Sequence, residues 1–226
     1  MVICLASVSD PNSRLLPAEE REAERALARK VGRGAVRCVL GPTARSWHIR
    51  ICKDELGKPF VIARWKKTTS REIPLSLSHA FPYALAVAAP TQAFRVGADV
   101  EQVRVFSDEV SAAFLTDQEA SLLASCSEIE RSVELTLCWS LKEAVLKALG
   151  VGLRMHPRNI DVSRALSSSG TFRALIGICG KDYEVLLWTK NVIHNRFVAT
   201  AVALTADKYD IMALQVHRSM ASLYDS

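Results

Sequence analysis

The 226-residue chain is predicted to adopt an α+β fold of two similar lobes, each with helices packed on a small antiparallel sheet. The prediction rests on helical and strand-like patterns that follow one another in the same order in both halves. The boundary between the lobes is expected near Pro90–Val96. This gives an N-terminal lobe of residues 1–95 and a C-terminal lobe of residues 96–226.

In the first half, residues 1–7 predict a strand, and two helical stretches follow over residues 17–31 and 31–40. Pro17 and the acidic residues behind it suit the first turn of a helix. Gly41 and the proline after it end the second stretch. Further strands are predicted from their apolar or alternating patterns at Trp47–Cys52, Phe60–Ile62, Leu75–Ser78 and Tyr83–Ala89.

The second half begins with a predicted strand at Phe94–Val100. Helices are expected at Ser107–Phe114 and Asp117–Cys126, and Thr116 with Glu119 three residues later forms a capping box for the second. A third helix contains Trp139 and ends near Gly150. A three-strand antiparallel meander then follows over Phe172–Cys179, Tyr183–Lys190 and Arg196–Thr205.

Composition narrows the class of protein. The net charge is +5, with 29 basic and 24 acidic residues and most of the excess in the first half, which favours an anionic partner.

No apolar run approaches the roughly 18 residues that span a bilayer, and the first residues lack the basic leader of a secretory signal. We therefore expect a cytoplasmic protein without a membrane segment. The six cysteines form no C-x-x-C pair, so neither a zinc site nor a disulfide framework is expected.

Two charged motifs point to chemistry. In the strand around Asp99, alternation places Gly97, Asp99 and Glu101 on one face, and the glycine leaves room for a ligand near the backbone. In the helix around Glu143, Trp139, Glu143 and Lys147 stand at positions i, i+4 and i+8 and therefore share one face. An apolar stripe occupies the opposite face. That stripe comprises Leu137, Leu141, Ala144, Val145 and Ala148.

Either motif alone is most often a solvated helix face or a turn, so the prediction depends on their joint occurrence. Three acids brought together with Lys142 and Lys147 would bind a divalent cation and a polyphosphate. The combination therefore predicts phosphoryl-group chemistry. A metal-dependent nuclease and a non-catalytic nucleic-acid module remain open at this point. Aromatic residues make up only 7% of the chain and are not interleaved with the basic positions, which disfavours the second alternative.

Four motifs occur in the order found in 4′-phosphopantetheinyl transferases. They are Gly57-Lys58-Pro59, Ser76-Leu77-Ser78-His79, Gly97-Ala98-Asp99-Val100-Glu101 and Trp139-Ser140-Leu141-Lys142-Glu143-Ala144-Val145-Leu146-Lys147. The chain resembles the surfactin-synthetase type of this family, a single chain of two pseudo-symmetric lobes with the active site in the cleft between them. Ala98 stands at a position that is usually a different aliphatic residue in the family.

The resemblance implies an enzyme that moves the 4′-phosphopantetheine group of coenzyme A to a serine of an apo acyl or peptidyl carrier protein and releases 3′,5′-ADP. The nucleophile would belong to the carrier. Such a carrier is acidic, and it is expected to dock near Leu153–Met155 and Arg158. The resemblance further implies a monomer that binds no nucleic acid. A relic that binds coenzyme A or the carrier without catalysis is the remaining alternative.

The resemblance also assigns roles to residues. Asp99, Glu101 and Glu143 would hold Mg²⁺, or alternatively Mn²⁺. Glu143 would be the general base, with Glu101 as the rival, and Lys147 would act on the pyrophosphate and the leaving ADP. The residues expected to contact coenzyme A are Arg29, Arg33, Lys58, Ser78, His79, Asp99, Lys142 and Lys147.

Overall fold

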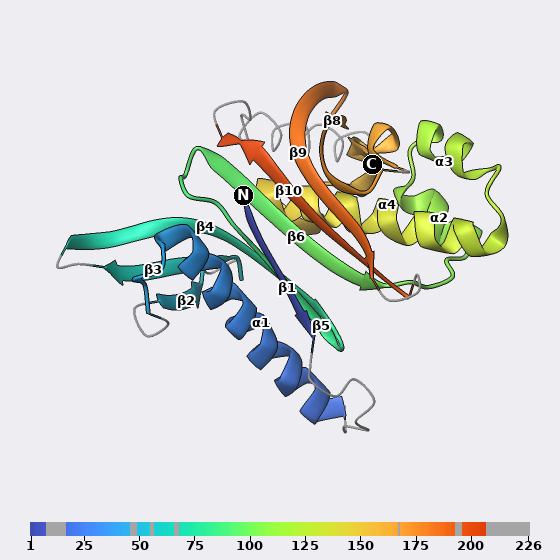
Figure 1. The fold of residues 1–226 in the computed structure, drawn as a ribbon. Helices are drawn as coiled ribbons and strands as arrows, with labels where there is room; N and C mark the ends of the chain where they lie inside the picture. The colour runs from blue at the N-terminus through green and yellow to red at the C-terminus, as the bar shows by residue number, and fades with distance from the viewer. Residues whose placement is uncertain are drawn as a thin grey trace, which may run out of the picture.

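A computed structural model describes residues 1–7, 17–45, 49–54, 57–65, 68–166, 168–192 and 196–206. It confirms the predicted α+β class: two five-stranded antiparallel sheets each carry one long helix (Figure 1). The first sheet takes its strands from the first half of the chain, and the second sheet takes its strands from the second half. No described helix is both long enough and apolar enough to cross a membrane.

The first sheet has the strand order β1-β5-β4-β3-β2, and α1 covers one of its faces. Residues such as Val31, Ala35 and Val36 of α1 are buried against Ile73 and Ala86 of the sheet. The elements of this half are β1 (Val2–Ser7), α1 (Pro17–Leu40), β2 (Ile49–Lys53), β3 (Pro59–Trp65), β4 (Thr68–Ala80) and β5 (Tyr83–Ala88).

Helix α1 is one continuous helix, so the expectation of two helical stretches is wrong. Its buried stripe continues without a break, because Ala28 and Val31 are followed at helical spacing by Ala35. A Cβ at Gly32 would come within 2.8 Å of the Ile51 side chain, so this glycine lets the helix lie close to the sheet. The helix ends as predicted before Gly41, which adopts a φ of +96°.

Strand β4 is longer than predicted, since it begins at Thr68 rather than at Leu75. Its first part is polar and lacks an apolar pattern, and it is extended because it pairs with β3. The predicted strand at Trp47–Cys52 begins outside the described residues, and its described part belongs to β2.

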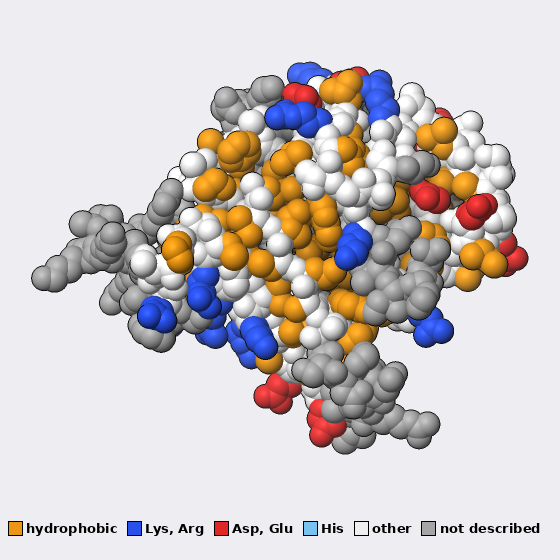
Figure 2. Space-filling model, viewed as in Figure 1, with side chains coloured by type: hydrophobic (Ala, Val, Ile, Leu, Met, Phe, Trp, Pro, Cys, Tyr) orange, Lys and Arg blue, Asp and Glu red, His pale blue; other side chains and the backbone are white. Residues whose placement is uncertain are grey.

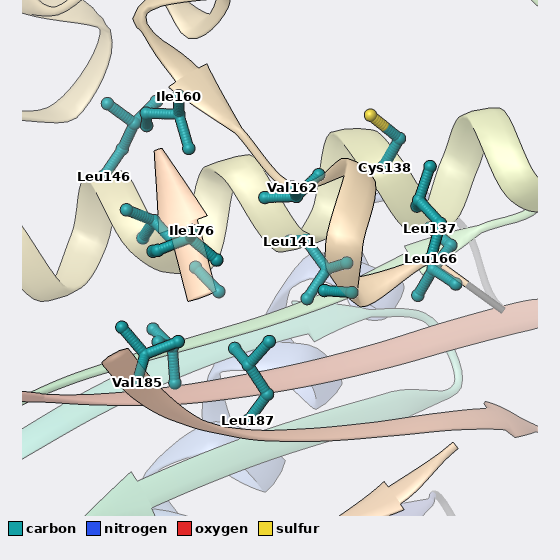
Figure 3. Close-up of a cluster of buried hydrophobic side chains, with 14 of the residues drawn as sticks. Leu137, Cys138, Leu141, Leu146, Ile160, Val162, Leu166, Ile176, Val185 and Leu187 are labelled. Carbon is teal, nitrogen blue, oxygen red and sulfur yellow. The ribbon is translucent and has the colours of Figure 1, made fainter. Parts of the chain in front are cut away.

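The second sheet has the order β6-β10-β9-β8-β7 and contains the predicted meander. Helix α4 lies on this sheet, and Leu141 faces Ile176 and Leu187 across the core (Figure 3). The elements are β6 (Phe94–Gln102), α2 (Asp108–Phe114), α3 (Asp117–Leu123), α4 (Glu128–Leu149), β7 (Ile160–Asp161), β8 (Gly170–Ile178), β9 (Lys181–Val192) and β10 (Phe197–Thr205), with short 3-10 turns η2 (Gly152–Arg154), η3 (Pro157–Asn159) and η4 (Ser163–Ala165).

The predicted helix ends are largely confirmed. Thr116 and Glu119 form the capping box of α3, and Gly150 ends α4 in the left-handed conformation with a φ of +73°. Helix α3 stops at Leu123, shorter than expected. Helix α4 begins at Glu128 behind a second capping box. All five predicted apolar stripe residues of α4 are buried.

The two sheets meet where β5 packs on β6 and β10. Leu85 and Val87 share a buried cluster with Ala98 and Val100. The hydroxyl of Ser76 on β4 accepts a hydrogen bond from the Ala98 N–H on β6 at 3.0 Å. The lobes are therefore joined by a common core and by side-chain hydrogen bonds. The predicted boundary between residues 95 and 96 falls inside β6, which begins at Phe94. The division into residues 1–95 and 96–226 stays a proposal.

Candidate functional site

The face of β6 that carries the acids lies against α4. A Cβ at Gly97 would overlap the backbone carbonyl oxygen of Ala144, so only glycine allows this approach. Since alternate residues of a strand share a face, Asp99 and Glu101 lie on the same side as Gly97. The close approach brings the strand's carboxylates to the turns of α4 that carry Glu143 and Lys147.

Asp99, Lys147 and Ser78 form a compact triangle of polar atoms. The Lys147 ammonium donates to Asp99 Oδ1 at 2.6 Å and to Ser78 Oγ at 3.2 Å, and Ser78 Oγ donates to Asp99 Oδ1 at 3.0 Å. The three residues come from β6, α4 and β4, and β4 belongs to the first sheet. The triangle therefore spans both lobes and contains three of the predicted site residues.

Asp99 has one carboxylate oxygen that no protein group satisfies. The residue is only 2% exposed, and its Oδ2 is buried without a hydrogen-bond partner. A buried carboxylate oxygen without a partner is costly. It is also a suitable ligand atom for a hard divalent cation, which prefers oxygen donors. The donor chemistry at Asp99 thus fits the predicted cation.

Glu101 and Glu143 are partly buried beside Asp99. Burial and the nearby charge of Asp99 raise the pKa of Glu101, against the opposing effects of Arg104 and Lys147. Burial likewise raises the pKa of Glu143, which Lys147 lowers and Asp99 raises. Mutual repulsion among these acids is typical of a site that a cation would neutralise.

In this structure Asp99, Glu101 and Glu143 are not arranged to coordinate one metal ion. In the described part of the chain, no three His, Cys, Asp or Glu side chains are grouped so that they could hold a metal ion. The Lys147 ammonium holds Asp99 Oδ1 in this arrangement. The predicted ligand set of Asp99, Glu101 and Glu143 therefore stays a proposal.

The expectation that Lys142 contacts the substrate is corrected. Its side chain is 0% exposed, and its ammonium donates to the carbonyl oxygens of Phe114 at 2.7 Å, Pro157 at 3.1 Å and Ile160 at 2.7 Å. It also forms an ion pair with Glu119 at 2.7 Å. An ammonium with four protein partners inside the core has no donor left for a phosphate. Lys142 instead ties α4 to α2, η3 and β7.

Sequence reasoning missed the structural role of Glu119, which it identified only as a helix cap. Its carboxylate accepts from the Thr116 N–H and the Val162 N–H, both at 2.8 Å, besides pairing with Lys142. The residue is 0% exposed. An acid and a lysine separated by more than twenty residues carry no local signal of pairing, so only the three-dimensional arrangement identifies this pair.

A cavity of about 430 Å³ adjoins the triangle, within the usual range for small-molecule sites. Both Lys58 and Lys147 line it, so the structure brings together two lysines that the sequence proposed as substrate contacts. Its walls come from both lobes. The other lining residues are Gly57, Pro59, Leu75, Ser76, Leu77, Leu146, Gly150, Val151, Gly152, Leu153 and Arg154.

The remaining predicted contacts lie apart from this cavity. His79 Nδ1 faces Glu24 Oε2 of α1 at 3.4 Å, and Glu24 Oε1 accepts from the Phe81 N–H at 2.8 Å. Arg29 and Arg33 are exposed on α1 and do not line the cavity of Lys147. On the face shown in Figure 2, Lys and Arg side chains gather over β2 and α1, whereas acidic side chains lie over the first turns of α1 and over α2 and α3.

The two raised pKa values predict how stability depends on pH. Because folding disfavours the charged forms of Glu101 and Glu143, the protonated acids contribute stability that is complete below the ordinary pKa of 4.5. This contribution is lost as pH rises through the raised values. In the metal-free protein, urea unfolding between pH 4 and 7 should show a smaller loss for Glu143→Gln than for wild type. An identical pH dependence in both proteins would contradict the assigned environment.

Comparisons with known proteins bear on the same part of the chain. Residues 95–202 match the family model described as the 4′-phosphopantetheinyl transferase superfamily. The solved structure of Thermotoga maritima holo-[acyl-carrier-protein] synthase is 21% identical, with a TM-score of 0.34, and the match covers 48% of this chain and 61% of that chain. No curated protein matches the chain. The segment that carries Asp99, Glu101, Glu143 and Lys147 is therefore similar to the 4′-phosphopantetheinyl transferase superfamily.

Proposed function

We propose that the protein transfers the 4′-phosphopantetheine group of coenzyme A to a serine of an apo carrier protein and releases 3′,5′-ADP. The observation that carries the proposal is the triangle of Asp99, Lys147 and Ser78, whose Asp99 Oδ2 is buried and unsatisfied. The family match over residues 95–202 supports phosphopantetheine transfer in general. The resemblance to the surfactin-synthetase type supports the finer assignment.

In the proposed reaction the carrier serine forms a bond to the phosphorus that bears the pantetheine arm, and the bond from that phosphorus to the ADP oxygen breaks. The chain's own residues bind and orient the pyrophosphate, because phosphoryl transfer depends mainly on positioning and charge stabilisation. Lys147 would exchange its bonds to Asp99 and Ser78 for pyrophosphate oxygens. Glu143 would accept the proton of the serine hydroxyl as the general base.

Asp99, Glu101 and Glu143 would hold a divalent cation, with Mg²⁺ the proposed ion. A cation bound there would offset the negative charge of the pyrophosphate and fix its orientation. Lys147, which pairs with Asp99 in this structure, would be available to the pyrophosphate once the charge of that carboxylate is balanced. The buried Oδ2 of Asp99 supports this part of the proposal.

The cavity of about 430 Å³ is the proposed binding site for coenzyme A. Lys58 and Lys147 supply positive charge at its wall, and leucine and valine side chains supply apolar surface. A nucleotide with an aliphatic arm requires both kinds of surface. His79, Arg29 and Arg33 do not line this cavity, so their proposed contacts with coenzyme A would lie outside it.

The direct test is intact mass spectrometry of apo carrier proteins incubated with the protein, coenzyme A and Mg²⁺. The carrier should gain one phosphopantetheine group, and the gain should disappear with EDTA and in the Glu143→Ala variant. Carriers from fatty-acid, polyketide and peptide synthesis are compared in parallel. No gain on any carrier would contradict the proposal and favour the nuclease or the non-catalytic relic.

The carrier is proposed to dock beside η2 and η3 through complementary charge. Arg154 donates to the carbonyl oxygens of Gly150 and Val151, both at 3.0 Å, so its replacement would also disturb the end of α4. Arg158 and its ion-pair partner Asp117 are both exposed. Replacement of Arg158 should therefore disturb the fold less and test the docking surface more directly.

We expect Arg158→Glu to raise the KM for an acidic carrier roughly tenfold, because it replaces attraction by repulsion at the interface rim. The KM for coenzyme A should stay unchanged, because Arg158 does not line the proposed coenzyme cavity. Steady-state kinetics with each substrate varied in turn measure both constants. Equal increases in the two KM values would contradict this docking surface.

A further inference from the structure

A second cavity, of about 510 Å³, meets the first at Lys58, Pro59 and Leu75, which line both. Arg95, near the start of β6, also lines it. Most of the remaining wall is apolar and consists of Phe60, Val61, Ile73, Pro74, Phe94 and Val96. The cavity thus combines two cations with an apolar surface.

Neither cation forms an ion pair with another residue of the described part of the chain. Arg95 Nε is buried and has no hydrogen-bond partner. Asp54 also lines the cavity, but its Oδ1 accepts a hydrogen bond from the Lys58 backbone N–H at 2.8 Å.

The lowered pKa of Lys58 agrees with an excess of positive charge in the second cavity. Burial and, next, the charge of Arg95 lower the pKa of Lys58, and the charge of Asp54 offsets part of this effect. The unsatisfied buried donor belongs to Arg95, one of these two cations. Two cations that repel each other are stabilised when an anion binds between them.

The position of Arg95 separates this cavity from the reacting centre. Arg95 lies on the same face of β6 as Gly97 and Asp99, because alternate residues point the same way. Its Cα is about 13 Å from that of Asp99, at about 3.3 Å per residue of strand. Lys147 does not line the second cavity. An anion at Arg95 is therefore a different group from one held at Lys147.

We infer that the second cavity is a binding site for a phosphate monoester, with Arg95 Nε–H as the specific donor and Lys58 as the second cation. Arginine and lysine are the usual partners of phosphate in proteins. The exposed parts of Phe60 and Phe94, 40% and 38% exposed, suit the ring or chain that carries the phosphate. If the phosphate is the 3′-phosphate of coenzyme A, this site rests on the proposed function; if it belongs to another molecule, it does not.

The test uses the Arg Nε–H signals in a ¹H–¹⁵N spectrum of the full chain. The Arg95 signal is the one absent from the Arg95→Lys variant. We expect inorganic phosphate to shift this signal saturably, beyond the effect of sodium chloride at equal ionic strength. The Arg95→Gln variant, followed through other signals of the cavity, should bind phosphate roughly tenfold more weakly. Arg173→Gln is the matched control, because Arg173 lies on β8 and faces Glu184.

Two further titrations identify the source of the phosphate. A shift with coenzyme A but not with 3′-dephospho-coenzyme A assigns the site to the 3′-phosphate of the transferase substrate. An undiminished response to inorganic phosphate in protein saturated with coenzyme A assigns it to a separate phosphorylated ligand. The site is overturned if phosphate moves the Arg95 signal no more than chloride does, or if Arg95→Gln binds phosphate with unchanged affinity. Neither result depends on transfer activity, so failure of the proposed function is recognised separately in the carrier assay.

Discussion

Replacement of Lys142 by methionine is expected to lower the free energy of unfolding by about 3–5 kcal/mol, among the largest effects of any single substitution in this chain. Methionine fills a similar volume, so the loss comes from electrostatics rather than from a void. The Glu119 carboxylate would stay in a core where both side chains are 0% exposed, without its cation. Three carbonyl oxygens would lose their donor at the same time. Urea unfolding monitored by circular dichroism measures the change.

The double variant Lys142→Met with Glu119→Gln separates charge from packing. It removes the uncompensated carboxylate and keeps one of the two oxygens that accept from the Thr116 and Val162 N–H groups, so it should be more stable than Lys142→Met alone. An exposed pair provides the control: Arg164→Met removes the partner of Asp182 and should cost only about 0–1 kcal/mol. A loss of similar size in Lys142→Met and Arg164→Met would contradict the role of the buried pair.

The Gly97→Ala substitution is the second change with a large expected effect. The new methyl group would overlap the carbonyl oxygen of Ala144, which is backbone and cannot turn aside. Strand β6 and helix α4 would have to separate, at a cost of about 3 kcal/mol or more. The separation would also move Asp99 away from Lys147, so activity should fall further than stability alone explains. Thermal unfolding and carrier-loading rates measured at low temperature distinguish the two effects.

Gly34→Ala is the matched control for this substitution. Gly34 lies within α1, and a Cβ there meets nothing within 4 Å. The change should therefore stabilise the protein by about 0.5–1 kcal/mol, through the higher helix propensity of alanine. Equal tolerance of alanine at both positions would contradict the close approach of β6 to α4.

Much of the fold could be predicted because local patterns encode it. The capping box at Thr116, the left-handed Gly150 and the apolar stripe of α4 each depend on residues close in sequence. The order of helices and strands in the two halves then indicated two sheets. The break predicted near Val31 was wrong, because α1 continues through Gly32, which lies against Ile51 of β2 and Leu77 of β4.

The candidate site was predictable only in part. The strand motif and the helix motif located Asp99, Glu101, Glu143 and Lys147, and the structure joins Asp99 to Lys147 directly. The environment of Lys142 could not be predicted, because its partners Phe114, Pro157 and Ile160 come from distant segments. A lysine beside a functional glutamate has the same sequence signal whether it faces a ligand or the core.

We propose that the transfer of phosphopantetheine takes place at Asp99. The most direct test is the rate at which an apo carrier gains the phosphopantetheine mass with wild type, Asp99→Asn and the exposed control Asp182→Asn. Asparagine preserves the shape of Asp99 but removes the charge that pairs with Lys147 and would hold the cation. We predict a loss of roughly 10²-fold or more for Asp99→Asn and an unchanged rate for Asp182→Asn. An Asp99→Asn variant that loads the carrier at the wild-type rate would contradict the account.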